Sequence, residues 1–286
     1  MALQVIRGIS QLRSALDKHR QKGERIVCVP TMGNLHEGHM ALIRLAHEYG
    51  EVVVATIFVN PLQFGLNEDW DQYPRTFESD VDKLNSEHCQ YLFFPTDEEM
   101  YPFGMDSQTR VFCPTMTDVL CGASRPGHFE GVTTVVTKLF HIADPDVAIF
   151  GEKDWQQLAV IRRMAADLCM RVKIVGAPIA RDTDGLALSS RNAFISKEER
   201  PRANQLNKSL EWAREQILSG NKDYGRIEAE AKQQILDAGF RPDYFSVCNA
   251  QNLTPALDED TDLAILGALF TEGARLIDNV QLKIKR

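Results

Sequence analysis

The sequence predicts an α/β protein in which a Rossmann-like, doubly wound parallel sheet is followed by a smaller C-terminal α+β domain. Short apolar runs alternate with helical patterns through the first half of the chain, a spacing typical of parallel sheets with helices on both faces. The apolar runs lack polar alternation, which indicates strands that are buried on both faces. After about residue 180, long charged helical patterns come before strand-like runs, so we expect domains at residues 1–179 and 180–286.

The elements of the first domain follow from hydrophobic periodicity. Met40, Leu42 and Ile43 lie on one stripe of a helix predicted at 39–49, whereas the run EVVVATIFV has no such period and predicts a strand. In order, we expect a strand at 25–30, a helix at 39–49, strands at 51–59 and 91–94 with a helix at 76–88 between them, a helix at 132–142, a strand at 146–150, a helix at 156–169 and a strand at 172–175.

The second domain begins with two amphipathic helical patterns rich in Ala, Glu, Gln, Lys and Arg. We place these helices at 197–219 and 226–238. Strand-like runs then follow at 243–249, 263–270 and 274–283, with Glu272-Gly273 as a turn signal between the last two.

Composition narrows the functional class. The 286 residues are 44% hydrophobic and 25% charged, which is ordinary globular usage and excludes collagen-like and disordered chains. A net charge of −8 without any basic cluster argues against nucleic acid and anionic membranes as partners. The longest apolar runs, 52–59 and 263–270, fall far short of the ~20 residues that a membrane-spanning helix needs.

The N-terminal residues and the cysteines suggest a cytoplasmic protein. Charge at Arg7 breaks the continuous apolar core that a signal peptide requires. The cysteines are scattered, without a C-x-x-C pair or zinc-like spacing, and we expect most of them to be buried thiols: Cys28, Cys89, Cys113, Cys121, Cys169 and Cys248.

The densest chemical signal is PTMGNLHEGH at residues 30–39, where a buried strand ends and a helix begins. Ligands bind at this place in open parallel sheets. Glycines let main-chain N–H groups approach a phosphate, and a helix N-terminus adds partial positive charge. His36 and His39 are three residues apart and share one helical face, so both can donate hydrogen bonds to a phosphoryl group.

Other interpretations of this segment remain open at this point. The H-x-x-H pair matches half of a zinc site, although no third and fourth ligands stand at metal spacing, and we expect no protein metal ligands. The histidines are also compatible with an ordinary exposed helix start. The strand–glycine–helix context favours phosphate.

Two later segments carry similar chemistry. GEKDWQQ at residues 151–157 again follows a strand. Lys153 supplies a mobile cation for phosphates, and Asp154 can accept hydrogen bonds from ribose hydroxyls. The alternative interpretation of this segment is a helix start with a salt bridge. The loop ALSSRN at 187–192 offers hydroxyls and a guanidinium suited to pyrophosphate, and the alternative is a capping turn before the next helix.

In order and spacing these segments resemble the pantothenate synthetase (pantoate–β-alanine ligase) family of the HxGH nucleotidyltransferase superfamily. PTMGNLHEGH is similar to its HxGH signature, GEKDWQQ to its lysine-bearing loop, and LALSSRN to its counterpart of the KMSKS loop. The segments VNPLQFG at 59–65, YPRT at 73–76 and RPGHFEGV at 125–132 also match, so the resemblance covers essentially the whole chain.

The resemblance implies ATP-dependent ligation of pantoate and β-alanine in coenzyme A biosynthesis. The pantoate carboxylate would attack the α-phosphate of ATP and give pantoyl adenylate and pyrophosphate, after which the amine of β-alanine would displace AMP. Magnesium is expected on the triphosphate, held largely by phosphate oxygens and water. The family also implies a homodimer.

The resemblance assigns site residues position by position. Catalysis is expected from His36, His39 and Lys153, and pantoate binding from two amides that can both donate and accept, Gln63 and Gln157, with Gln63 also near β-alanine. The residues expected to bind ATP are Met32, Gly33, Asn34, Leu35, His36, Glu37, Gly38, His39, Gly151, Glu152, Lys153, Asp154, Ala180, Leu188, Ser189, Ser190 and Arg191.

Departures from the family pattern are small, and three other functions compete. Leu188 stands where Met is common, Trp155 where Phe is common, and Ala180 where a branched residue is usual, which weakens only the assignment of Ala180.

The competing functions are another HxGH nucleotidyltransferase such as a mononucleotide adenylyltransferase, an aminoacyl-tRNA synthetase fragment, and a catalytically silent nucleotide-binding protein. The negative charge disfavours the synthetase fragment.

Overall fold

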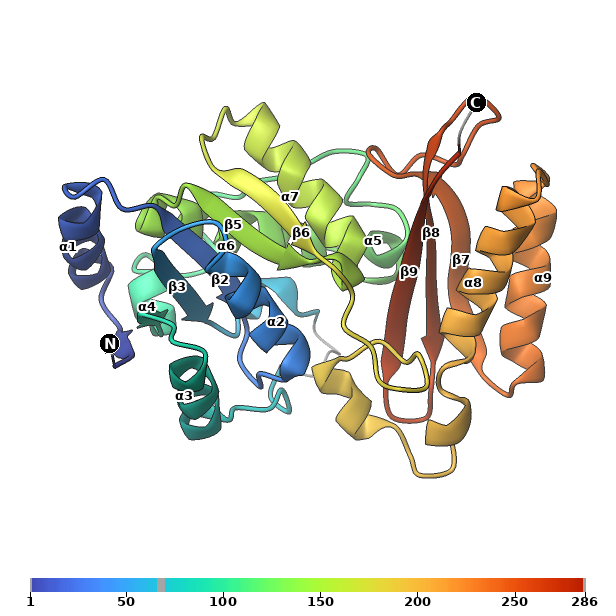
Figure 1. Cartoon of the computed structure of the whole chain (residues 1–286), viewed down its shortest axis with the longest axis horizontal. Helices are drawn as coiled ribbons and strands as arrows, with labels where there is room; N and C mark the ends of the chain where they lie inside the picture. The colour runs from blue at the N-terminus through green and yellow to red at the C-terminus, as the bar shows by residue number, and fades with distance from the viewer. Residues whose placement is uncertain (1, 66–69, 285–286) are drawn as a thin grey trace. The chain divides into compact units, whose positions relative to one another are not determined.

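A computed structural model describes residues 2–65 and 70–284 (Figure 1). Residues cluster into two compact units, the first made of 1–117, 125–152 and 160–178 and the second of 118–124, 153–159 and 179–286. Two short internal segments thus belong with the C-terminal part of the chain. The division of the protein into domains at residues 179 and 180 remains a prediction.

The first unit contains the predicted parallel sheet. Its six strands are β1 (Gln4–Ile6), β2 (Ile26–Thr31), β3 (Val52–Ile57), β4 (Tyr91–Phe93), β5 (Val147–Gly151) and β6 (Lys173–Ala177). They lie in the order β1-β4-β3-β2-β5-β6, and all of their pairings are parallel. The fold class predicted from the sequence is confirmed.

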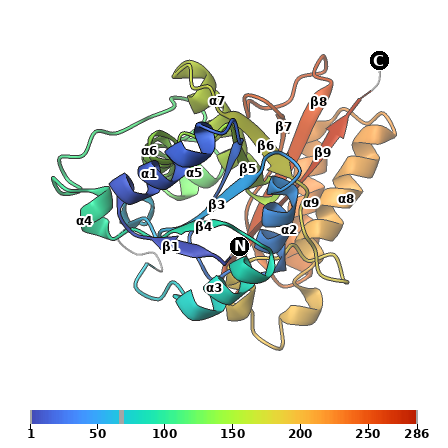
Figure 2. The ribbon, with the colours of Figure 1, turned by 60° about the vertical axis from the view of Figure 1, so that its left-hand side comes forward.

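Helices cover both faces of this sheet (Figures 1 and 2). On one face, Val27 and Val29 of β2 pack with Ile43 of α2 and Leu84 of α3. On the other face, Phe150 of β5 contacts Phe140 of α6, with 6.3 Å between ring centroids. The helices of this unit are α1 (Ile9–Arg20), α2 (Glu37–Ala46), α3 (Phe77–Ser86), α4 (Asp97–Met100) and α6 (His128–Ala143), and α7 (Trp155–Asp167) is shared with the second unit.

The second unit is an antiparallel sheet with helices on one face. Its strands β7 (Arg241–Asn249), β8 (Asp262–Phe270) and β9 (Arg275–Lys283) pair in that order. The helices α8 (Gln205–Leu218) and α9 (Tyr224–Asp237) pack on it through Leu210, Ile227, Phe245 and other buried apolar residues. Trp155 and the short helix α5 (Cys121–Ser124) belong to this unit as well.

The structure corrects several predicted elements. The helix expected at 197–219 is wrong in its first part, where a 3-10 turn at Arg200–Arg202 precedes α8 at Gln205. Pro201 explains the difference, because proline has no N–H to donate and is tolerated only in the first turn of a helix. The strand β1 and the helix α1 were not predicted, and the helix expected at 132–142 begins earlier, at His128.

Most of the cysteines are buried free thiols, as predicted, and only Cys169 is exposed. Burial raises the pKa of Cys28 and of Cys248 to about 12, and that of Cys89 to about 11. The thiolate is the reactive species, so these buried groups are inert at neutral pH.

We therefore expect one thiol of the folded protein to react rapidly with Ellman's reagent at pH 8. The five others should react only after denaturation in guanidinium chloride, and the rapid phase should be absent from Cys169→Ser. Rapid reaction of two or more thiols in the folded protein would contradict the burial described above.

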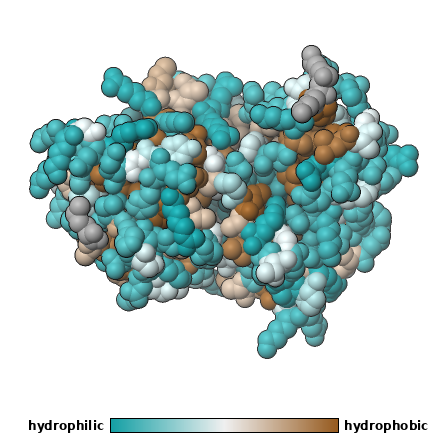
Figure 3. Space-filling model, viewed as in Figure 1, coloured by the Kyte–Doolittle hydropathy of each residue, from teal (hydrophilic) through white to brown (hydrophobic). Residues whose placement is uncertain are grey.

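The surface view agrees with an ordinary globular composition. On the face drawn in Figure 3, hydrophilic residues predominate and hydrophobic residues form scattered patches. Within residues 2–65 and 70–284, no helix combines the length and the apolar character needed to cross a membrane.

Candidate active site

The nucleotide-binding segment predicted from the sequence lies where the sheet reverses its order. From β2 the chain continues into β3 and β4 on one side, whereas β5 and β6 lie on the other side. The strands β2 and β5 are parallel neighbours, so their carboxyl ends, at Thr31 and Gly151, lie at one edge of the sheet. Such a switch point is where open α/β sheets bind ligands.

The turn after β2 is held by a buried carboxylate. The side chain of Asp80, on α3, is 1% exposed and accepts from the main-chain N–H groups of Asn34 at 2.9 Å and Leu35 at 2.8 Å. Gly33 adopts φ +84°, and a Cβ there would lie 3.0 Å from Ile57 Cγ2. The glycine and the carboxylate together fix the path of the chain from β2 into α2.

The two histidines cap the start of α2. Nδ1 of His36 accepts from the N–H of Gly38 at 3.1 Å, and Nδ1 of His39 accepts from the N–H of His36 at 3.2 Å. Their ring centroids are 4.1 Å apart. Because each Nδ1 accepts a hydrogen bond, each neutral ring carries its proton on Nε2. The pair therefore provides two N–H donors at the positive end of a helix dipole.

Gln63 is held by a buried chain of polar groups in the first unit. Tyr101 Oη donates to Asn60 Oδ1 at 2.6 Å, and Asn60 Nδ2 donates to Gln63 Oε1 at 3.3 Å. Burial raises the pKa of Tyr101 and keeps its phenol protonated. The Gln63 amide consequently has its oxygen occupied and donates from Nε2, at 2.8 Å to Met32 Sδ.

The backbone around Gln63 also depends on a glycine in α6. A Cβ on Gly131 would lie 2.3 Å from the carbonyl oxygen of Leu62 and 2.6 Å from Gln63 Cα. His128, one turn earlier, makes a 2.8 Å hydrogen bond from Nδ1 to the carbonyl oxygen of Gln63. Helix α6 therefore approaches the 3-10 turn Pro61–Gln63 closely enough to fix its backbone.

The remaining predicted residues follow β5 or belong to the second unit. Gly151 and Glu152 are part of the first unit, and Lys153, Asp154 and Gln157 are part of the second. Lys153 Nζ lies 3.9 Å from Asp154 Oδ1. The neighbouring Gln156 is buried and binds the main chain of Val119 and Cys121, which is a structural role.

The predicted phosphate loop is carried by a short hairpin in the second unit. Residues 180–188 fold back on themselves, with Arg181 bridged to Ala187 and the N–H of Leu188 donating to Ala180 O at 2.9 Å. The turn that follows starts at Ser189, whose Oγ accepts from the N–H of Arg191 at 3.2 Å. The alternative, a turn that caps the helix expected from residue 197, is wrong: Ser189 instead caps the 3-10 helix Ser190–Phe194, and the next α-helix begins only at Gln205.

Comparison with known proteins decides the family. The family model described as "Pantoate-beta-alanine ligase" matches residues 4–281. The chain belongs to the pantoate-beta-alanine ligase family. Its curated relatives include the pantothenate synthetases of Saccharophagus degradans, 58% identical over 282 residues that make up 99% of each chain, and of Cellvibrio japonicus, 59% identical over 98% of this chain and 99% of that one.

Solved structures of the pantoate-beta-alanine ligase family share the fold. The pantothenate synthetase of Thermus thermophilus has a TM-score of 0.90 at 42% identity, covering 97% of this chain and 98% of that chain. The ligase of Francisella tularensis, solved with β,γ-ATP and β-alanine, has a TM-score of 0.82 at 32% identity over 98% and 97% of the two chains.

Sequence reasoning missed the residues that hold the site in place. Asp80, Asn60, Tyr101 and Gly131 were given no role, although Asn60 and Gly131 lie in segments that resemble the pantoate-beta-alanine ligase family. Asn60 stands beside Pro61 at the end of an apolar run, and this break in the run is the one local signal that could have drawn attention to it. No group of three or more His, Cys, Asp or Glu side chains suited to a metal ion occurs among residues 2–65 and 70–284.

Proposed function

We propose that the protein joins pantoate to β-alanine in an ATP-dependent reaction, through a pantoyl adenylate intermediate. Membership of the pantoate-beta-alanine ligase family across residues 4–281 carries this proposal. The paired N–H donors of His36 and His39 at the start of α2 support it, because they suit a phosphoryl group that gains negative charge.

In the first half-reaction the carboxylate of pantoate attacks the α-phosphorus of ATP. A bond forms between a carboxylate oxygen and the α-phosphorus, the bond from the α-phosphorus to the oxygen that bridges it to the β-phosphorus breaks, and pyrophosphate leaves with that bridging oxygen. The Nε2–H groups of His36 and His39 would donate to the phosphoryl oxygens, and Lys153 and Arg191 would pair with the other phosphates. The protein thus positions the reactants and stabilises charge.

In the second half-reaction the amine of β-alanine attacks the acyl carbon of the adenylate. The C–N amide bond forms and the bond between the acyl carbon and the bridging oxygen breaks, so AMP leaves with the oxygen that the carboxylate had brought. The proton released from the amine passes to solvent. Gln63 and Gln157 are the proposed ligands of pantoate. The contacts of Gln63 support a donor role for its Nε2, which suits the carboxylate or a hydroxyl oxygen of pantoate.

The remaining ATP ligands are proposed from the family motifs. Within the first unit these are the main chain from Met32 to His39 together with Gly151 and Glu152. Within the second unit they are Asp154, Ala180 and Leu188 to Arg191.

We also propose that Mg²⁺ accompanies the triphosphate, held by phosphate oxygens and water as this ion prefers. When bound, the ion neutralises phosphate charge. No protein ligand is assigned to it. Chelation by EDTA should abolish turnover, and excess Mg²⁺ should restore it.

We propose that the protein is located in the cytoplasm and forms a homodimer. Sedimentation velocity tests the proposed dimer.

The experiment that tests the proposed function is exchange of labelled pyrophosphate into ATP without β-alanine. We expect exchange that depends on pantoate. Exchange that requires an amino acid or a mononucleotide in place of pantoate would contradict the proposed substrate.

A second experiment tests the donor role of Gln63. Tyr101→Phe removes one of the two contacts that orient Asn60, the other being the 3.1 Å bond from Asn60 Nδ2 to Gly131 O, and so weakens the hold of Asn60 on the Gln63 amide. One lost hydrogen bond is worth about 1 kcal/mol, so we expect a roughly fivefold to tenfold rise in the KM for pantoate with little change in the KM for ATP. Steady-state kinetics of the exchange reaction give both values.

The matched control is Tyr224→Phe in the second unit. Tyr224 is also a buried tyrosine, and its Oη has no hydrogen-bond partner among the described residues. This variant should keep wild-type kinetics. Equal changes in the KM for pantoate and for ATP in Tyr101→Phe would contradict a specific effect through Gln63.

A further inference from the structure

Two adjacent polar residues are buried in the middle of β9. Asp278 is 5% exposed and Asn279 is 1% exposed. Neighbouring residues of a strand point to opposite faces, so Asp278 shares its face with Leu276 and Leu282 of the apolar core, and Asn279 shares the other with Gln281. Burying a polar group is unfavourable unless the group is hydrogen-bonded. The hydrogen-bond partners of Asp278 and Asn279 therefore indicate the role of these two residues.

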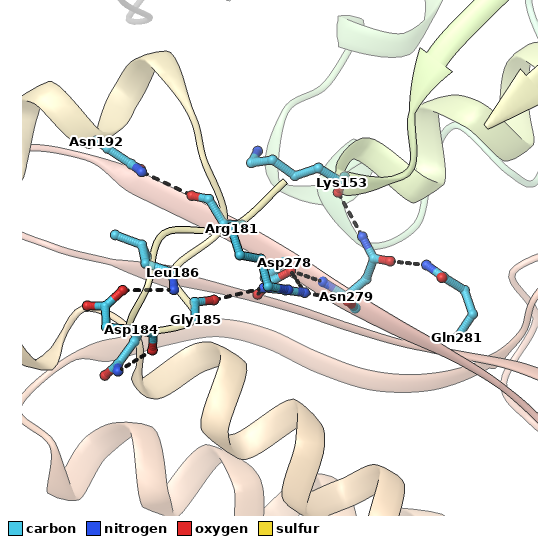
Figure 4. Close-up of polar contacts among 11 residues, drawn as sticks. Lys153, Arg181, Asp184, Gly185, Leu186, Asn192, Asp278, Asn279 and Gln281 are labelled. Atoms are coloured by element: carbon cyan, nitrogen blue, oxygen red, sulfur yellow. Dashed lines mark hydrogen bonds and ion pairs between the residues drawn. The ribbon is translucent and has the colours of Figure 1, made fainter. Parts of the chain in front are cut away.

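Asn279 binds the main chain at Lys153. Its Nδ2 donates to the carbonyl oxygen of Lys153 at 2.8 Å, and its Oδ1 accepts from Gln281 Nε2 (Figure 4). Gln281 thereby fixes the orientation of the amide, and the amide fixes the backbone that carries the Lys153 side chain. Asn279 and Lys153 are 126 positions apart in the sequence.

Asp278 binds the hairpin that leads to the predicted phosphate loop. Its carboxylate accepts from both terminal nitrogens of Arg181, at 2.6 Å and 3.0 Å, and Arg181 also donates to the carbonyl oxygen of Gly185 at 3.0 Å (Figure 4). The guanidinium therefore ties both the first arm of the hairpin and its turn to β9. The second arm continues directly into Leu188 and Arg191.

We propose that Asp278 and Asn279 are positioning residues that set the placement of Lys153 and of the 188–191 loop within the second unit. This inference rests on the proposed function, in which Lys153 and Arg191 contact the phosphates of one ATP molecule. Two cations that serve one triphosphate need a fixed separation, and a misplacement of about 1 Å can lower a rate by about 100-fold. Adjacent residues on one strand provide that separation.

The test for Asn279 is a double-mutant cycle with Lys153, measured by pantoate-dependent pyrophosphate exchange. Asn279→Ala should lower kcat/KM for ATP about tenfold in the wild-type background and less than twofold in the Lys153→Ala background. Gln281→Met removes the bond that orients the Asn279 amide but keeps its Nδ2 donor, so it should give a smaller loss, about twofold to fourfold, that also disappears in the Lys153→Ala background. The matched control is Asn252→Ala, in an exposed turn of the same unit, which should stay within twofold of wild type. An equal loss in both backgrounds would identify a general structural effect and overturn the proposal.

The test for Asp278 uses Arg181→Lys, which keeps the charge but cannot bind the carboxylate through two nitrogens. We expect a roughly fivefold rise in the KM for ATP that disappears in an Arg191→Ala background. Arg214→Lys, which changes an exposed pair on α8, is the control. Thermal unfolding of every variant, monitored by circular dichroism, identifies the temperature at which all of them are folded, and the kinetics are compared there.

The wild-type protein separates the two hypotheses. If it catalyses pantoate-dependent exchange and the cycles are additive, the positioning role is wrong and the proposed function stands. If it catalyses no exchange with pantoate, the proposed function is wrong and the positioning role falls with it.

Discussion

His39→Ala should lower the turnover number about 100-fold to 1000-fold while changing the KM for ATP less than threefold. Nδ1 of His39 is occupied by the N–H of His36, so Nε2 carries the proton that can reach a phosphoryl oxygen. That hydrogen bond strengthens as negative charge develops, and a donor used mainly in the transition state affects turnover more than ground-state binding. Steady-state exchange kinetics at saturating pantoate measure both quantities.

Two variants accompany this measurement. His39→Gln retains an N–H donor and should recover part of the lost turnover. His47→Ala, on the exposed end of the same helix where the ring contacts the carbonyl oxygen of Glu87, should leave turnover unchanged. A fall in ATP affinity as large as the fall in turnover would make His39 a binding residue only.

Asp80→Asn should lower the free energy of unfolding by about 3 kcal/mol and kcat/KM for ATP by more than tenfold. The carboxylate accepts from the N–H groups of both Asn34 and Leu35, and hydrogen bonds to a charged group contribute about 1.5–3 kcal/mol each. An asparagine has the same shape but only one acceptor oxygen. Its NH₂ group would face one of the two main-chain N–H donors, and neither of these two facing donors would have an acceptor. The loop that carries the histidines then loses its fixed path.

Guanidinium chloride unfolding and exchange kinetics check this prediction together. Asp82→Asn, an exposed change on the same helix, is the control and should move the unfolding free energy by less than about 0.5 kcal/mol. If Asp80→Asn were as stable as the control, the loop would not depend on the carboxylate.

The parts of the fold that depend on local periodicity were predictable from the sequence. Val27, Val53 and Val147 lie in continuous apolar runs, and the structure places them in the core on one face of the sheet. The site signal of residues 30–39 was equally local, because glycine at the turn and two histidines one helical turn apart have a direct structural interpretation. Periodicity failed at the start of the helix expected at 197–219. Pro201 lacks the N–H that a helix interior needs, and the charged helical pattern around it did not compensate for this loss.

The residues that hold the site in place could not be predicted, because their partners are far away in the sequence. Asp80 lies 46 positions after Asn34, and Tyr101 lies 41 positions after Asn60. Asp80 resembles any polar position on an exposed helix, and only the packing of α3 against the turn after β2 removes it from water. A single sequence contains no local pattern that indicates contacts between positions so far apart.

The two units are interlaced along the chain, and this affects how the protein can be divided. The polypeptide passes from one unit to the other five times, after residues 117, 124, 152, 159 and 178. A recombinant fragment that begins at residue 180 would lack Trp155, whose indole N–H donates to Ala250 O at 3.1 Å, and Lys153, which binds Asn279. A single protease cut near residue 179 would likewise leave the second unit incomplete, because its segments 118–124 and 153–159 would remain on the N-terminal product. Gene fusions and minimal crystallisation fragments are therefore better designed around the whole chain.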